Sequence, residues 1–121
     1  MKILIVDDNS HDREALKFFL QGNGFQDVYL ATNGTECIEM ALDLRPEVII
    51  LDVFLKEMTG YGICNSLKSH KELDCKIIMM TGEFHQNDPS AASQAAPDFF
   101  LAKTGVYDGI LKIIQRLQAN T

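Results

Sequence analysis

Four short apolar runs in this chain each end in a polar or charged residue. Carboxylates are expensive to bury unless they are paired, so acids at the ends of buried strands require an explanation. If the strands are parallel, their carboxyl ends meet at one edge of a sheet, and these polar groups converge there. The residues that end the four runs are Asp7 with Asp8, then Asp52, Thr81 and Lys103.

Apolar, strand-like segments alternate along the chain with segments of helical period. This alternation is typical of an α/β fold, a doubly wound parallel sheet with helices on both faces. The run Val48-Ile49-Ile50-Leu51 is apolar throughout, as a strand covered on both faces must be. The five predicted strands lie near residues 2–7, 27–31, 47–52, 76–81 and 98–102.

The segments between the strands carry helix start and stop signals. The last has the clearest pattern, with Ile110, Ile113, Ile114 and Leu117 on one face. The fourth offers only alanines for packing, so we expect a short helix there. The predicted starts are Asn9 or Ser10 as the first cap, then Asn33-Gly34, Gly60, Asp88-Pro89 and the residues just before Gly109.

Length and composition limit the class of protein. A chain of 121 residues with 46% hydrophobic and 23% charged residues predicts a single globular domain over residues 1–121. Its apolar runs are far too short to cross a bilayer, and no signal peptide precedes the first strand, so we expect a cytoplasmic protein with no membrane partner.

The charge and the cysteines exclude other classes. Eleven basic against seventeen acidic residues give a net charge of −6, which opposes direct binding to nucleic acid. Cys37, Cys64 and Cys75 are odd in number and widely spaced, which predicts small buried residues in a reducing compartment.

The polar groups at the strand ends suit phosphoryl chemistry. Clustered carboxylates need a cation, and their hard oxygen ligands favour Mg²⁺. A lysine ammonium and a threonine hydroxyl can hold phosphoryl oxygens, so one carboxylate could be a nucleophile that forms an aspartyl phosphate. Singly, Asp8 could be a helix cap, Thr81 an ordinary strand-end residue and Lys103 a solvated lysine. Their joint occurrence favours the site.

In this order and spacing, Asp7-Asp8, Asp52, Thr81 and Lys103 resemble the site of a response-regulator receiver domain, and the resemblance covers essentially the whole chain. It implies a flavodoxin-like (βα)5 fold with strand order 2-1-3-4-5. It also implies that a sensor histidine kinase or a histidine phosphotransfer protein phosphorylates Asp52.

The resemblance assigns roles to individual residues. Asp8 and Asp52 would bind Mg²⁺ directly, Asp7 through water and Phe54 through its backbone carbonyl. Thr81 and Phe100 would be switch residues, and their movement would repack an effector surface formed by the fourth helix, fifth strand and fifth helix. The positions of Phe54 and Glu83 tune phosphoryl lifetime in the family, and bulk at Phe54 predicts slower hydrolysis.

The sequence departs from the family pattern after two of the strands. Met58 and Gly60 are kept, but Lys56 replaces a frequent proline after Asp52. Thr104 replaces the usual proline after Lys103, where a cis bond is costly without proline. We therefore expect an altered loop after Lys103.

The predicted function is a phosphoacceptor signalling domain that catalyses only its own phosphorylation and dephosphorylation. A small Mg²⁺-dependent phosphatase is the enzymatic alternative, but the chain has no cap segment and no D-x-D motif at Asp7. A flavin-binding protein would suffer repulsion between Asp7-Asp8 and the flavin phosphate, and an unphosphorylated docking module would not need the complete site. The domain could stand alone or belong to a longer protein, and it could form a homodimer through its last helix.

Overall fold

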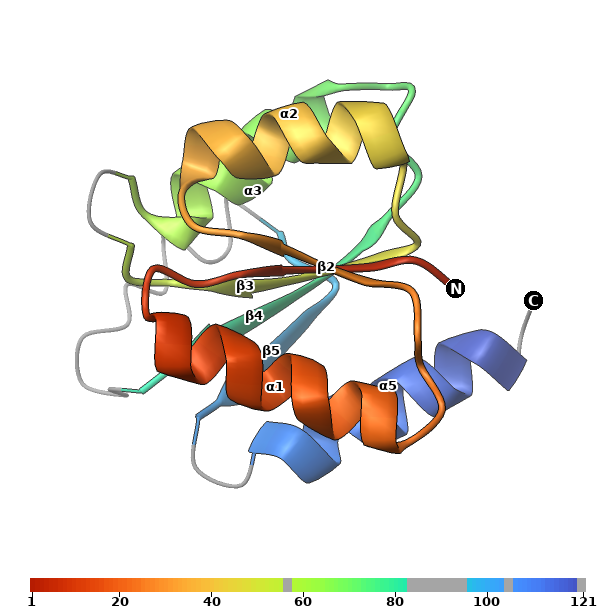
Figure 1. The fold of residues 1–121 in the computed structure, drawn as a ribbon. Coiled ribbons are helices and arrows are strands. Elements are labelled where there is room, and N and C mark those ends of the chain that lie inside the picture. Colours follow the sequence, from red (N-terminus) through yellow and green to blue (C-terminus); the bar gives the residue numbers. More distant parts are fainter. Residues whose placement is uncertain (56–57, 83–95, 104–105, 120–121) are drawn as a thin grey trace.

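The computed structural model describes residues 1–55, 58–82, 96–103 and 106–119, and its centre is a five-stranded parallel sheet (Figure 1). The strand order is β2-β1-β3-β4-β5, which confirms the predicted doubly wound fold. Each predicted strand is present to within about a residue. The strands are β1 (Ile3–Val6), β2 (Val28–Ala31), β3 (Val48–Asp52), β4 (Lys76–Thr81) and β5 (Phe99–Ala102).

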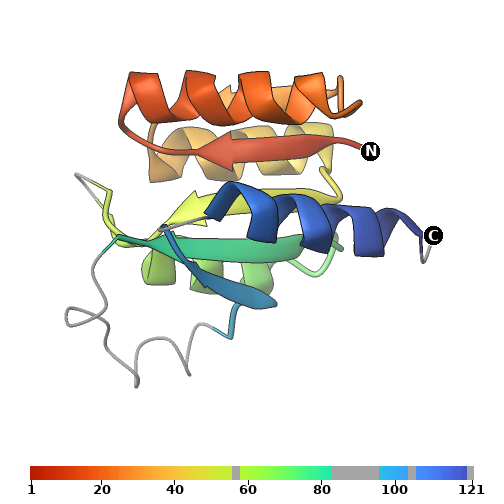
Figure 2. The ribbon, with the colours of Figure 1, turned by 90° about the horizontal axis from the view of Figure 1, so that it is seen from below.

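Helices cover both faces of the sheet. α1 and α5 lie together on one face, and α2 and α3 lie on the other (Figures 1 and 2). The fourth predicted helix falls mainly on residues 83–95, outside the described residues. The helices are α1 (Ser10–Gly22), α2 (Gly34–Leu44), α3 (Gly60–Ser69) and α5 (Val106–Ala119).

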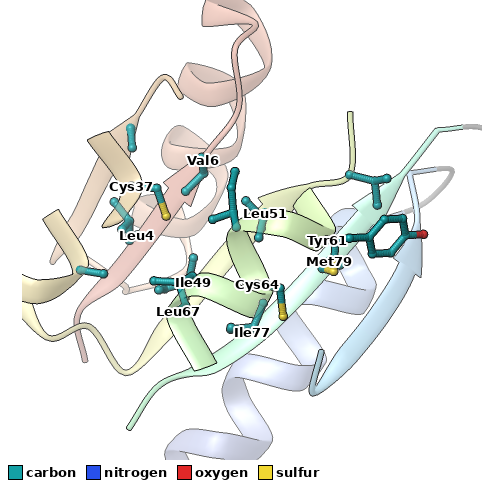
Figure 3. Close-up of a cluster of buried hydrophobic side chains, with 14 residues drawn as sticks. Leu4, Val6, Cys37, Ile49, Leu51, Tyr61, Cys64, Leu67, Ile77 and Met79 are labelled. Atoms are coloured by element: carbon teal, nitrogen blue, oxygen red, sulfur yellow. The ribbon is translucent and has the colours of Figure 1, made fainter. Parts of the chain in front are cut away.

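The sheet separates two hydrophobic cores because successive strand side chains point to opposite faces. Leu4 and Val6 pack under α2 and α3, whereas Ile3 and Ile5 pack under α1 and α5. Figure 3 shows the first of these cores, in which Ile49 and Leu51 fill the space below the two helices. A strand with both faces covered has no position for a polar residue until it ends, so polar groups collect at the strand ends.

Polar side chains fix the starts of three helices. The side chains of Asn9, Asn33 and Thr59 accept hydrogen bonds from the backbone N–H groups of residues three positions later. Of the two residues proposed for the first cap, Asn9 has that role, and Ser10 is the first helical residue. α2 ends at Leu44, before Pro46, as predicted, and its C-cap Arg45 has a left-handed backbone with φ 50°.

The cysteine prediction holds for the two residues in the α2 and α3 core. Cys37 and Cys64 are buried, and burial raises the pKa of their thiols to about 12 and about 11. Cys75 is half-buried. Within the described parts of the chain, no helix combines the length and the apolar character that a bilayer span requires.

Candidate functional site

Parallel pairing brings the carboxyl ends of four strands to one edge of the sheet. Asp52 and Thr81 are the last residues of β3 and β4, and Asp7 and Lys103 directly follow β1 and β5. Backbone hydrogen bonds extend the ladders past the strands: the Asp7 N–H donates to Ala31 O at 3.2 Å, and the Lys103 N–H donates to Thr81 O at 2.7 Å. The sheet itself therefore positions these groups.

The Asp52 carboxylate is buried, with the residue only 5% exposed, and its two oxygens have different partners. Oδ1 accepts the backbone N–H of Phe54 at 3.1 Å, which fixes the orientation of the carboxylate. Oδ2 accepts a hydrogen bond from Lys103 Nζ at 2.6 Å. This charge-assisted contact joins the end of β3 to the end of β5.

The Asp7 carboxylate is buried as deeply, with the residue 3% exposed. Burial raises the pKa of Asp7, although a hydrogen bond from the Asn9 N–H to Oδ1 and the charge of Lys103 act to lower it. Oδ2 lies 3.8 Å from Lys103 Nζ, and the Arg13 guanidinium donates to the Asp7 carbonyl at 2.8 Å. The Asp7 carboxylate thus has less compensation than Asp52 for the loss of water.

The Lys103 ammonium lies among three carboxylates. Besides Asp52 and Asp7, Asp12 Oδ2 is 3.9 Å from Nζ. Burial acts to lower the pKa of Lys103, but the hydrogen bond to Asp52 and the three negative charges outweigh it and hold the pKa above its ordinary value. Lys103 is therefore fully protonated at neutral pH and can act as a fixed positive charge.

The proposed switch residues lie on the α2 and α3 side of the sheet. Thr81 is completely buried, and its neighbour across the β4–β5 ladder is Ala102. Phe100 is half-buried, and its ring stacks on that of Tyr61 in α3, with centroids 6.5 Å apart and planes 7° from parallel. Thr81 and Phe100 thus lie on adjacent paired strands, and the Lys103 N–H bonds to the Thr81 carbonyl.

A pocket of about 400 Å³ opens beside these groups. Its wall includes the half-exposed Asp8 and Phe54, which is 42% exposed. Among the described residues, no three His, Cys, Asp or Glu side chains are grouped closely enough to hold a metal ion. Mg²⁺ usually takes only one or two protein carboxylates and keeps several waters, so it does not need three grouped side chains. The carboxylates that line the pocket therefore suit a hydrated Mg²⁺ ion. The lining residues are Asp7, Asp8, Asn9, Asp12, Asp52, Phe54, Gly82 and Lys103.

Sequence reasoning missed Asp12, and it assigned no site role to Asn9 or Tyr61. Asp12 lies in the first turn of α1, and only the packing of α1 beside the end of β5 shows that it faces Lys103. An acid one helical turn after the acid pair is the one signal that could have found it. The predicted lifetime residue Glu83, and the departures at Lys56 and Thr104, lie outside the described residues.

The family model of the response regulator receiver domain matches residues 3–115, and the chain therefore belongs to this family. The family match confirms the resemblance and does not favour the phosphatase or docking-module alternatives. The expected class, the receiver domain of a two-component response regulator, is thereby established.

Individual relatives agree with the family assignment. Response regulator MprA of Mycobacterium leprae (strain TN) is 33% identical over 121 residues, which are 100% of this chain and 52% of that protein. The chain thus spans about half the length of the curated relatives it matches.

Solved structures of receiver domains have the same fold. One is the signal receiver domain of a signal transduction histidine kinase from Syntrophus aciditrophicus, with 30% identity and a TM-score of 0.85 over 99% of this chain and 91% of that one. Another is the response regulator TrrA from Thermotoga maritima in complex with Mg²⁺ and BeF, with 29% identity and a TM-score of 0.84 over 97% of this chain and 99% of that one.

Proposed function

We propose that Asp52 accepts a phosphoryl group from a phosphohistidine on a sensor histidine kinase or a histidine phosphotransfer protein. The observation that carries this proposal is the geometry of the Asp52 carboxylate. The Phe54 N–H holds Oδ1, while Oδ2 is paired with Lys103. Oδ2 attacks phosphorus, the new P–O bond forms as the P–N bond of the donor breaks, and the leaving imidazole nitrogen keeps the electron pair.

Lys103 has two successive partners in this reaction. Before transfer, its ammonium donates a hydrogen bond to Asp52 Oδ2 at 2.6 Å. After transfer, the same ammonium pairs with a phosphoryl oxygen, since the esterified Oδ2 has lost most of its charge. The Thr81 hydroxyl donates to a second phosphoryl oxygen, and Phe100 follows Thr81 through the shared β4–β5 ladder.

Asp8 and Asp52 would hold Mg²⁺ together with the Phe54 carbonyl, with Asp7 acting through water. The bound ion supplies positive charge that neutralises the attacking carboxylate and the phosphoryl oxygens. The negative pocket around Asp7, Asp8 and Asp52 supports this assignment. The complex of TrrA with Mg²⁺ and BeF supports it from a homologous protein.

The phosphorylated domain would act in the cytoplasm as a signal, without turnover of an external substrate. Its output surface would comprise the fourth predicted helix, β5 and α5. This surface would bind an effector or a second copy of the chain. Glu83, two residues after Thr81 in the sequence, would tune phosphoryl lifetime together with Phe54.

Phe54 would set part of the signal's lifetime. Its ring borders the pocket beside Asp52 and can shield the acyl phosphate from water. A Phe54→Asn variant should lose its phosphoryl group several-fold faster than the wild type after the donor is removed. Equal or slower loss would exclude a shielding role for this ring.

The mass of the intact protein tests the proposed function. With acetyl phosphate and Mg²⁺, the wild type should gain the mass of one phosphoryl group, and EDTA or the Asp52→Asn substitution should abolish the gain. Asp43→Asn is the matched control, because Asp43 is an exposed carboxylate in the last turn of α2. A gain that persists in Asp52→Asn, or that needs no Mg²⁺, would contradict the proposal.

A further inference from the structure

Asp12 is a fourth carboxylate at the phosphoacceptor pocket and has no place in the motif that defines the family site. It follows Asn9 by three residues, and its N–H donates to Asn9 Oδ1 at 3.0 Å. This cap fixes the residue in the first turn of α1. Its carboxylate then points toward the end of β5, 3.9 Å from Lys103 Nζ.

The Asp12 side chain lines the same pocket as Asp52 and lies nearer to its solvent side. It is 50% exposed, whereas the Asp52 side chain is 7% exposed. Asp12 and Lys103 also border a second, mainly apolar cavity of about 150 Å³ between α1 and α5, floored by Leu16, Met80 and Val106. Among the described residues, Lys103 is the only cation that lines either cavity.

Among the described residues that line the pocket, carboxylates outnumber cations. They comprise the four aspartates Asp7, Asp8, Asp12 and Asp52 and one ammonium, that of Lys103, which is paired with Asp52. A bound Mg²⁺ would offset the acids that hold it, and Asp12 would not be one of them, because its carboxylate faces Lys103 Nζ at 3.9 Å. The bound ion would therefore leave the negative charge of Asp12 to act on a phosphodonor that enters the pocket.

We propose that Asp12 determines phosphodonor specificity by repelling small, highly charged phosphodonors from the mouth of the Asp52 pocket. A free acyl phosphate is a dianion and carries its whole charge past Asp12. A phosphohistidine is presented by a protein that can bring compensating positive charge. Asp12 thus protects the domain from phosphorylation by metabolites, and the inference rests on the proposed function of Asp52.

The test compares two free donors of different charge, acetyl phosphate as the dianion and phosphoramidate as the monoanion, with Mg²⁺ present. The rate of mass gain with acetyl phosphate should rise about threefold in Asp12→Asn, with a smaller rise for phosphoramidate. In Asp12→Asn, the ratio of the acetyl phosphate rate to the phosphoramidate rate should therefore exceed the wild-type ratio at low salt. At high salt the two ratios should be equal. Asp12→Glu, which keeps the charge, should retain the wild-type ratio.

Glu14→Gln is the matched control, because Glu14 is an exposed acid two residues further along α1 and so on another side of the helix. It removes the same charge and should leave the ratio unchanged. An unchanged ratio in Asp12→Asn, or an equal change in Glu14→Gln, would overturn the inference while the phosphorylation of the wild type stood. If the wild type itself gained no phosphoryl group, the proposed function would fail and the inference with it.

Discussion

At the scale of single residues, the two buried aspartates differ in how well they are compensated. Asp52 has the Phe54 N–H and a lysine at 2.6 Å, whereas Asp7 has the Asn9 N–H and a lysine at 3.8 Å. The raised pKa of Asp7, caused chiefly by burial, is the electrostatic result. Sites that hold uncompensated charge for function commonly lower the stability of the fold.

Asp7→Asn should therefore stabilise the protein. Asparagine keeps an oxygen that can accept the Asn9 N–H and removes the buried charge, so we expect the free energy of unfolding at neutral pH to rise by about 1 kcal/mol. The same variant should be phosphorylated more slowly. Urea denaturation measures the first effect, and a loss of stability would show that Lys103 fully compensates Asp7.

The pH dependence of stability tests the same point. Because the folded-state pKa of Asp7 is raised, the folded protein binds this proton more tightly than the unfolded chain does. The wild type should gain stability relative to Asp7→Asn as the pH falls through the folded-state pKa of Asp7. The gain should be complete below the unfolded-state value near 3.8. A difference in the free energy of unfolding between the wild type and Asp7→Asn that does not change with pH would contradict the effect of burial on Asp7.

At the scale of elements, the start of α3 packs directly against the end of β3, where the phosphoacceptor lies. The Gly60 N–H donates to Val53 O at 2.7 Å, so α3 begins directly against the residue that follows Asp52. A Cβ added at Gly60 would clash with the Asp52 carbonyl oxygen and would lie 2.8 Å from Val53 Cα. Both obstacles are backbone atoms, so the glycine is required for the close approach.

Gly60→Ala should destabilise the fold by about 1–3 kcal/mol, because the backbone must move to accept the methyl group. It should also slow phosphorylation, since the backbone atoms that must move belong to Asp52 and Val53, next to the Phe54 N–H that holds Asp52 Oδ1. Gly62→Ala is the control: its nearest added contact is Thr59 Oγ1 at 3.6 Å, and alanine favours the helix. Chemical denaturation and rates of mass gain measure both variants, and equal effects of the two substitutions would contradict this role for Gly60.

Some features of the fold and site could be predicted from the sequence, and others could not. The strands could be predicted because burial on both faces demands continuous apolar runs such as Val48 to Leu51, and parallel pairing then places their polar ends together. Asp12 could not be found in this way, because its contact with Lys103 depends on how α1 packs beside β5 and α5. The stacking of Phe100 on Tyr61 likewise depends on the position of α3, which no local pattern encodes.

At the scale of the whole molecule, two cores on opposite faces hold the sheet rigid, and the chemistry lies at its carboxyl edge. Side chains within the strands are committed to the cores, so only the residues at and just beyond the strand ends are available for a site. The Lys103 contact with Asp52 spans the sheet from β5 to β3. Transfer of a phosphoryl group to Asp52 would change the partner of Lys103 and so alter the contact between these strands.

The most direct test of this account is to locate the phosphoryl group on the chain. The protein is treated with acetyl phosphate and Mg²⁺, reduced with borohydride, which converts an aspartyl phosphate to homoserine, and sequenced as peptides by mass spectrometry. We predict homoserine at position 52 and unmodified aspartate at positions 7, 8 and 12. Homoserine at one of those other positions, or a phosphoryl adduct that borohydride leaves intact, would contradict the assignment of Asp52 as the phosphoacceptor.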